Sequence, residues 1–416
     1  MSTAVATVSG RISVRRARVL GILFLLLAAF AAGFFGPRAA GGETATFGLG
    51  TNAPALTLPV QATLYAISAL MAFLGAVQLV RGFGSRTYLV LGVVVGVFVF
   101  SLLVYAARGG SLNLTAMLNS TLLRSVPITL GALSGILCER AGVINIAIEG
   151  MFLAAAFTGA ITGSASGSLW VGLICGVLVG GVLGWVLAVL SIRYRVDQIV
   201  AGTVINIFAL GMTSYLSASI LQTNQALNNP GRFQVFEIPL VAEIPVAGPI
   251  LFRNNVFVYL MFGLLFLVHI ALFRTRWGLR VRAVGEHPLA ADTVGIRVLF
   301  ERYRSVILGG MMAGLGGAFF TLGSVGRFDE GMTAGRGFIA LAAMIFGRYS
   351  PWGAFGAALV FGFADSLQTR LAILDVGLPS EFLLMAPYIA TILVVAGVVG
   401  RARPPAADGK PYIKEG

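Results

Sequence analysis

Residues 254–323 read NNVFVYLMFGLLFLVHIALF (254–273), then RTRWGLRVRAVGEHPLAADTVGIRVLFERYR (274–304), then SVILGGMMAGLGGAFFTLG (305–323). The two outer pieces are apolar and long enough to cross a bilayer, which takes ~20 apolar residues. The middle piece holds seven of the 29 Lys and Arg residues of the chain. Arginine-rich loops stay on the cytoplasmic side of a membrane. The pattern predicts a membrane-embedded body that presents one large charged loop to the cytoplasm.

The same apolar pattern runs along most of the chain, which is 57% apolar and only 11% charged. It predicts an all-α, polytopic transmembrane bundle of about 10–12 spans. The segment 337–349 is short for a span and ends before Pro351, so we expect a short or broken helix there. The predicted spans are 19–36, 58–80, 87–106, 119–138, 142–162, 169–190, 199–221, 254–273, 305–323, 337–349, 351–370 and 381–400.

The basic residues fix the direction of the spans. Alternating from a cytoplasmic N-terminus places 21 of the 29 Lys and Arg residues on the inner side, which predicts that both termini are cytoplasmic. The net charge of +13 alone would also suit a nucleic-acid binder. Because the basic residues are scattered between spans, membrane orientation explains them better, and we expect no nucleic-acid partner.

Glycine is abundant, with 54 residues, and it is spaced in a regular way. Gly172, Gly176, Gly180 and Gly184 fall every fourth residue in the sixth predicted span. Such a stripe forms a flat helix face against which another backbone can approach closely. The spacing therefore predicts tight packing between helices, and a dinucleotide-binding loop is excluded because the glycines lie inside spans.

Several functions lack the residues they need. The only lysines are Lys410 and Lys414, and neither stands in a P-loop motif, so we expect no ATP hydrolysis by this chain. No catalytic residue, cofactor or metal site is predicted, because the two cysteines and two histidines are isolated in sequence. Ionisable residues inside the predicted spans are too few for a proton relay. A transporter whose ATP is bound and hydrolysed by a separate subunit fits better.

Two further segments carry a specific resemblance: CERAGVINIAIEGMFLAAAFTGA (138–160) and RAVGEHPLAADTVGI (282–296). Together they resemble the membrane permeases of ABC importers in the branched-chain amino acid, ribose and nucleoside group, most of all the nucleoside permeases. The resemblance covers 111–400 and implies a permease core. Residues 1–110 would then be a cytoplasmic tail with accessory spans, and 401–416 a cytoplasmic tail. It also implies a multi-pass protein of the bacterial cell membrane that imports its solute.

Residues 282–296 lie in the cytoplasmic loop 274–304. Pro288 suits the first turn of a short helix over 289–294, and Gly295 suits its end. A soluble ATPase subunit could grip such a helix in a groove. The resemblance implies the same role, a coupling helix, whereas an amphipathic helix resting on lipid headgroups is the alternative. The predicted coupling residues are Arg282, Gly285, Glu286, Pro288, Leu289, Ala290, Ala291, Val294 and Gly295.

Polar residues in the spans are candidates for the solute path. Asn145 and Glu149 are four apart and are expected to share a helix face. A buried carboxylate costs about 2–3.5 kcal/mol, so Glu149 should face protein or water. It would either bind the solute or cap a neighbouring broken helix. Weaker candidates are Asn119, Thr203, Asn206 and Phe338, and Asp365 could pair with Arg370.

The leading prediction is a permease subunit that translocates a small polar solute, most of all a nucleoside. A pentose or another simple sugar, or a branched-chain amino acid, is the alternative within the same machinery. A self-sufficient channel or secondary carrier is the alternative of another class, and a membrane scaffold is a third. The expected partners are a cytoplasmic ATPase subunit, a second permease, an extracytoplasmic substrate-binding lipoprotein and membrane lipid.

Overall fold

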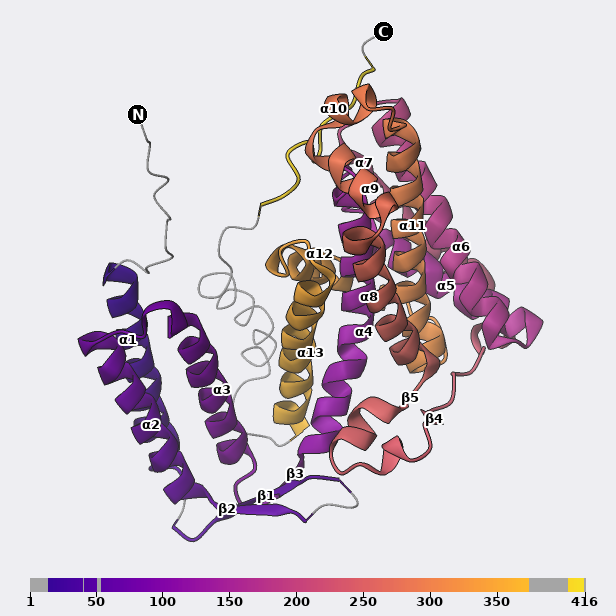
Figure 1. Cartoon of the computed structure of the whole chain (residues 1–416). Coiled ribbons are helices and arrows are strands. Elements are labelled where there is room, and N and C mark those ends of the chain that lie inside the picture. The colour runs from indigo at the N-terminus through magenta and orange to yellow at the C-terminus, as the bar shows by residue number, and fades with distance from the viewer. Residues whose placement is uncertain (1–13, 40, 51–53, 374–402, 415–416) are drawn as a thin grey trace, which may run out of the picture. The chain divides into compact units, whose positions relative to one another are not determined.

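The computed structural model describes residues 14–39, 41–50, 54–373 and 403–414 (Figure 1). Nine helices of this part are long and apolar enough to cross a membrane. Strands are few and short. The chain is therefore an all-α polytopic helical bundle, as the apolar pattern predicted. The twelfth predicted span, 381–400, lies outside the described residues.

The described residues divide into two compact units, and residues 14–39, 41–50, 54–117 and 368–373 form the first. Its long helices expose large apolar side chains such as Leu26, Phe73 and Leu89, as membrane spans do. A small sheet joins them: β1 pairs antiparallel with β2 (Thr44 opposite Pro59) and parallel with β3 (Thr46 opposite Ser111). Its elements are α1 (Val14–Phe30), β1 (Thr44–Gly48), β2 (Leu56–Pro59), α2 (Val60–Val80), α3 (Thr87–Ala106) and β3 (Ser111–Asn113).

The second unit contains residues 118–367 and 403–414. It holds all or most of the helices α4 (Leu114–Glu139), α5 (Ile148–Ser166), α6 (Leu169–Ala188), α7 (Gln198–Leu216), α8 (Val256–Arg274), α9 (Arg276–Glu286), α10 (Pro288–Thr293), α11 (Val298–Ala318), α12 (Arg336–Phe346) and α13 (Pro351–Ile373). A two-residue ladder pairs β4 (Phe236–Glu237) with β5 (Arg253–Asn254). The helix α4 is the most deeply buried span of this unit, and it continues through Pro127 without a break.

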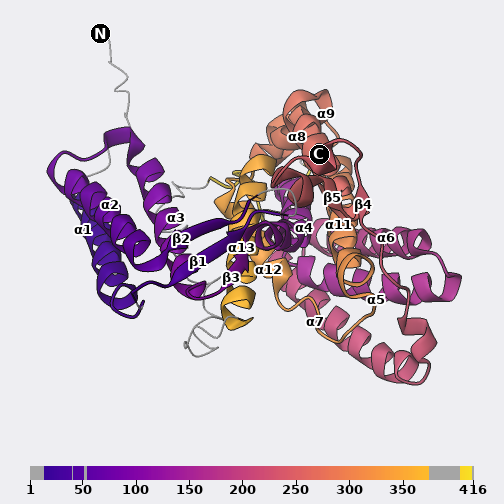
Figure 2. The same cartoon turned by 90° about the horizontal axis from the view of Figure 1, so that it is seen from below.

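Glycine determines how the central helices pack. The helices α6, α5 and α7 lie side by side (Figure 2), and α11 packs against α5 and α6. A Cβ atom at Gly184 would lie 2.8 Å from the carbonyl oxygen of Val306 on α11, and one at Gly180 would overlap Gly310 and Gly314. The predicted glycine stripe is confirmed as the face on which α6 meets α11 and α5.

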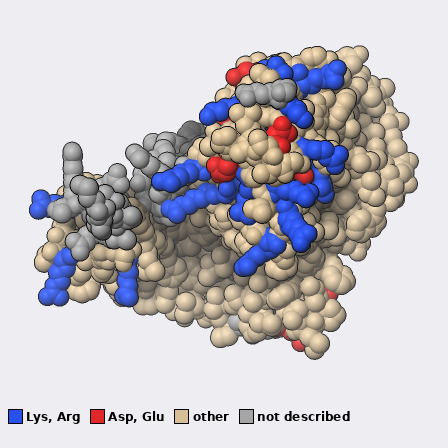
Figure 3. Space-filling model, turned by 45° about the horizontal axis from the view of Figure 1, so that its top comes forward, with Lys and Arg blue, Asp and Glu red and all other residues tan. Residues whose placement is uncertain are grey.

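The second unit has two distinct ends. One end, here called the α10 end, carries α9, α10 and the chain segment 403–414, and the ladder of β4 and β5 lies at the other (Figure 1). Basic side chains spread across the α10 end with a few acidic ones between them (Figure 3). The arginine-rich loop 274–304 therefore forms a compact, helical and basic surface.

Two predicted boundaries need comment. The short helix expected near 337–349 is confirmed as α12, which has 11 residues. The fifth span was predicted to begin at residue 142, but α5 begins at Ile148. Residues 143–146 take no regular structure, so an unwound stretch precedes the helix. Apolar composition alone does not distinguish such a stretch from a helical turn.

Candidate functional site

The carboxylate of Glu149 binds the beginning of the short helix α12. Its Oε1 atom accepts hydrogen bonds from the hydroxyl of Thr333 (2.6 Å) and the backbone N–H of Gly335 (2.8 Å), and its Oε2 atom accepts one from the N–H of Gly337 (2.6 Å). The first N–H groups of a helix have no partner inside the helix and favour negative charge. Glu149 therefore provides an anionic cap for α12.

The backbone of α12 lies directly against the first turn of α5. Gly335 precedes α12 with φ +78°, a left-handed conformation that glycine adopts without strain. A Cβ atom at Gly337 would lie 2.5 Å from the N atom and 2.6 Å from the Cα atom of Glu149. A larger side chain at position 337 would push the two helices apart and separate the carboxylate from its donors.

Two asparagines stabilise the unwound stretch before α5. Asn145 is fully buried; its amide donates to the hydroxyl of Ser134 (3.2 Å), and its carbonyl accepts from the N–H of Ala147 (3.1 Å). Asn206 on α7 donates to the carbonyl oxygen of Ile146 (2.9 Å) and accepts from the N–H of Gly150 (2.7 Å). These amides satisfy backbone groups that the missing helical turns leave without partners.

The expectation that Asn145 and Glu149 share a helix face is wrong, because Asn145 lies outside α5. Instead, the structure brings Asn145, Glu149 and Asn206 to one junction. There the unwound stretch, the start of α5 and the start of α12 meet. Broken helices at bilayer depth line the solute sites of many transporters.

A charged cluster lies next to this junction and was not predicted from the sequence. Asp365 on α13 forms ion pairs with Arg124 on α4 (2.5 Å) and with Arg336 at the start of α12 (3.4 Å). The side chains are partly exposed, by 31% for Arg124, 27% for Arg336 and 25% for Asp365. The guanidinium of Arg336 also lies over the ring of Phe320, 5.8 Å from its centroid. The sequence suggested a pair of Asp365 with Arg370, which both lie on α13. The ion pairs with Arg124 and Arg336 instead connect α13 to α4 and α12.

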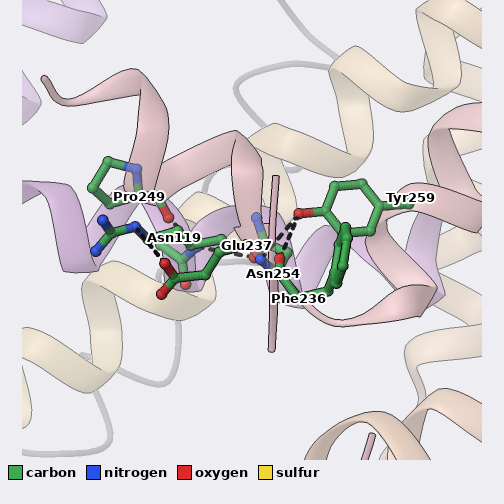
Figure 4. Close-up of polar contacts among 7 residues, drawn as sticks. Asn119, Phe236, Glu237, Pro249, Asn254 and Tyr259 are labelled. Carbon is green, nitrogen blue, oxygen red and sulfur yellow. Dashed lines mark hydrogen bonds and ion pairs between the residues drawn. The ribbon is translucent and has the colours of Figure 1, made fainter. Parts of the chain in front are cut away.

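The remaining path candidates are placed apart from the junction or on its surface. Phe338 is half exposed on α12. Thr203 is exposed on α7, and its hydroxyl donates to the carbonyl oxygen of Ile199 on the same helix (2.8 Å). Asn119 lies near the β4–β5 ladder, where its amide donates to the carbonyl oxygen of Pro249 (2.9 Å) and to Oδ1 of Asn254 (3.0 Å) (Figure 4). It connects α4 to the loop at the end opposite α10.

The short helix predicted from Pro288 and Gly295 is present as α10. Pro288 begins it, and the Nδ1 atom of His287 accepts a hydrogen bond from the N–H of Ala290 (3.1 Å). Gly295 follows it with φ +83°. Val294 is 74% exposed and Leu289 is 42% exposed. The short helix therefore presents apolar side chains outward, which is typical of a docking surface.

Other predicted coupling residues face inward. Ala291 is only 3% exposed and packs in a small cluster with Val284 of α9 and Val298 of α11, so it is not available to a partner. Gly285 lies so close to the backbone of Arg140 that any Cβ atom would overlap it. Arg282 lies over the ring of Phe273, 5.2 Å from its centroid. These residues hold α9 and α10 on the bundle rather than forming their outer surface.

Among the residues that the structure describes, no group of three His, Cys, Asp or Glu side chains is placed to hold a metal ion. A groove of about 470 Å³ lies between α9 and the start of α11. Its lining includes Arg276, Arg280 and Arg297. The α10 end therefore combines exposed apolar side chains with arginines, a composition suited to a protein partner that carries acidic groups.

Comparison with known proteins agrees with this architecture. Residues 117–399 match the family described as branched-chain amino acid transport system / permease component. No solved structure matches the chain significantly.

Three relatives illustrate the similarity. The guanosine ABC transporter permease protein NupQ of Bacillus subtilis is 40% identical over 72% of this chain and 97% of its own length. The nucleoside ABC transporter permease protein NupC of Lactococcus lactis is 37% identical over 73% and 98%. The putative glucose ABC transporter permease protein TsgC13 of Haloferax volcanii is 33% identical over 63% and 79%. The chain is a multi-pass membrane protein, and it belongs to the family of permease components of branched-chain amino acid transport systems.

Proposed function

We propose that this chain is a permease subunit of an ABC importer and that the imported solute is a nucleoside. The observation that carries the proposal is the similarity along 97% and 98% of two permeases named for guanosine and nucleosides. The broken helices of the core support it, because solute sites of transporters lie where helices are interrupted. The 33% identity to a putative glucose permease makes a simple sugar the second candidate.

The energy for transport comes from a separate ATPase subunit, and this chain needs no cofactor of its own. The α10 end faces the cytoplasm, as do both termini, since the excess of arginine in short loops sets membrane orientation. The ATPase subunit docks on α10, where Leu289 and Val294 are exposed. The arginines around the groove below α10 pair with acidic groups at the rim of that interface.

Two further partners complete the importer. A second permease covers the partly exposed cluster of Arg124, Arg336 and Asp365, because charges at bilayer depth face protein or water rather than lipid. An extracytoplasmic lipoprotein delivers the solute to the end that carries β4 and β5. The solute path runs along the exposed side of α12, past Phe338, whose ring can stack on a nucleobase. Glu149, Asn145 and Asn206 hold the broken helices in place.

The direct test is to purify the complex with its ATPase subunit, its second permease and its binding lipoprotein. ATP hydrolysis would be measured in lipid nanodiscs with guanosine, ribose, glucose and leucine in turn. We expect nucleosides to stimulate hydrolysis and the other solutes to leave it at the basal rate. If glucose or leucine alone stimulated hydrolysis, the imported solute would be a sugar or an amino acid and not a nucleoside. Active accumulation by this chain without an ATPase subunit would refute it altogether.

A further inference from the structure

The chain segment 403–414 is attached to the two short helices of the α10 end. The N–H of Ala406 donates to Oε2 of Glu286 (3.2 Å), and the N–H of Ala407 donates to the carbonyl oxygen of Gly285 (2.9 Å). Both acceptors belong to the last turn of α9, directly before His287 caps α10. The segment therefore binds where α9 ends and α10 begins.

A tyrosine anchors the segment beneath α10. Tyr412 is only 7% exposed and packs with Val284 of α9, Ala291 of α10 and Val298 of α11. It is the largest side chain of this cluster, so the segment supplies much of the apolar contact between the three helices. The neighbouring Ile413 is 54% exposed and points away from the cluster.

The segment also binds the buried guanidinium group of an arginine. Arg302 near the start of α11 is 1% exposed, and its Nη1 atom donates to the carbonyl oxygen of Lys410 (2.9 Å). A buried charge is costly unless polar groups surround it. The carboxyl group of Asp408 lies close enough to Arg302 to interact with it electrostatically. The segment therefore helps to keep α11 in place at the α10 end.

A fourth attachment reaches the unwound stretch before α5. The carboxyl group of Asp408 interacts with that of Glu139, the last residue of α4. Gly409 adopts φ +74°, and a Cβ atom there would lie 2.8 Å from the Cδ1 atom of Ile144. Ile144 immediately precedes Asn145 in the unwound stretch. One short segment thus contacts α9, α10, α11 and the chain that continues into α5.

We propose that residues 404–413 form a positioning strap for energy coupling: the strap fastens the docking helix α10 to the unwound stretch before α5, so that a displacement of α10 by the ATPase reaches Glu149 and α12. The inference rests on the proposed function, because it needs a nucleotide-driven displacement at α10. Its role is mechanical, so no strap residue touches solute or nucleotide. Removing the Tyr412 anchor should separate ATP hydrolysis from transport while leaving both partners bound.

The test is the number of nucleoside molecules imported per ATP hydrolysed, measured in proteoliposomes that contain the complete complex. In Tyr412→Ala we expect this ratio to fall about fivefold or more, the lower bound of typical coupling between sites. Basal ATP hydrolysis and the subunit stoichiometry should stay unchanged. Ile413→Ala, the exposed neighbour, serves as the control and should transport like the wild type.

Two further measurements keep the test decisive. Tyr412→Val retains an apolar group and should give an intermediate ratio, and it replaces the alanine variant if that variant does not assemble. A synthetic peptide of residues 401–416, added inside the liposomes, should restore the ratio of Tyr412→Ala, whereas the peptide with alanine at position 412 should not. Wild-type ratios in assembled Tyr412→Ala and Tyr412→Val would overturn the strap. A wild-type complex without nucleoside-stimulated hydrolysis would instead overturn the proposed function.

Discussion

Glu149 brings a negative charge into the helical bundle, and the groups around it explain why a charge is tolerated there. Two backbone N–H groups and one hydroxyl donate to its carboxylate within 2.8 Å. Hydrogen bonds to a charged group contribute more than neutral ones, and a buried donor left without its acceptor is costly. The residue therefore determines where α12 begins.

Replacing Glu149 by Gln would place an amide donor against one of these donors. We expect the complex to lose about 2 kcal/mol of stability, the usual cost of breaking a charge-assisted hydrogen bond, and uptake to fall with it. Thermal melting of the purified protein without any solute would show the effect. The control is Glu330→Gln, which changes an exposed carboxylate in the loop that precedes α12. Unchanged melting together with a raised KM for uptake would assign Glu149 to the solute instead.

Asp408 in the strap gives a prediction about pH. Burial raises the pKa of Asp408 from 3.8 to about 6. A carboxyl group with a raised pKa binds its proton more tightly in the docked strap than in a free one, so docking weakens as pH rises from 3.8 to about 6 and changes little above that. The groups that face it are Glu139 and Arg302, with Tyr349 nearby.

Hydrogen exchange of the amides of residues 405–413 would measure this dependence. After correction for intrinsic rates, we expect stronger protection at pH 5 than at pH 8 in the wild type. Asp408→Asn should show a smaller difference between the two values, because the amide does not titrate and of the two carboxyl groups only Glu139 remains. Equal pH dependence in the two proteins would show that Asp408 is not the group responsible.

At the scale of elements, the seam between α6 and α11 depends on glycine. A Cβ atom at Gly180 would overlap the backbone of Gly310 and Gly314, whereas one at Gly211 on α7 would meet nothing within 4 Å. We therefore expect Gly180→Ala to cost about 1–3 kcal/mol of stability through overpacking, and Gly211→Ala to cost far less. The comparison needs only size-exclusion profiles and melting temperatures of the two variants. Equal behaviour would contradict the packing assigned to the stripe.

The helix α10 supplies the second prediction at this scale. Val294 is 74% exposed beside it, and Leu240 in the loop before the β5 strand is 88% exposed. Val294→Asp should weaken binding of the ATPase subunit about tenfold or more, as loss of a central apolar contact does. Leu240→Asp should leave binding unchanged because it lies at the other end. Binding of purified ATPase subunit to the permease in nanodiscs would be the measurement.

At the scale of the whole molecule, the sequence predicted those features that depend on local pattern. Apolar length located the helices, and Pro288 with Gly295 located α10, because each signal lies within one element. The start of α5 was misplaced, since an unwound stretch of apolar residues resembles a helical turn in composition. The short strands β1 and β2 were not predicted either.

Contacts between distant segments could not be predicted from one sequence. Asn206 binds Ile146 across 60 residues, and Arg302 binds Lys410 across 108. The ion pairs of Asp365 with Arg124 and Arg336 likewise join three helices. Nothing in the spacing of these residues shows that they meet. The sequence therefore predicts the candidate path only as a set of polar positions. The structure shows which of them hold the broken helices in place and which are exposed.

We propose above all that a separate ATPase supplies the energy for transport and that its movements reach this permease through α10. The most direct measurement is uptake of radiolabelled guanosine into proteoliposomes containing the complete complex, with either the active ATPase or a variant that binds but does not hydrolyse ATP. We expect accumulation against a gradient with the active ATPase and none with the inactive one. Accumulation with the inactive ATPase would contradict it.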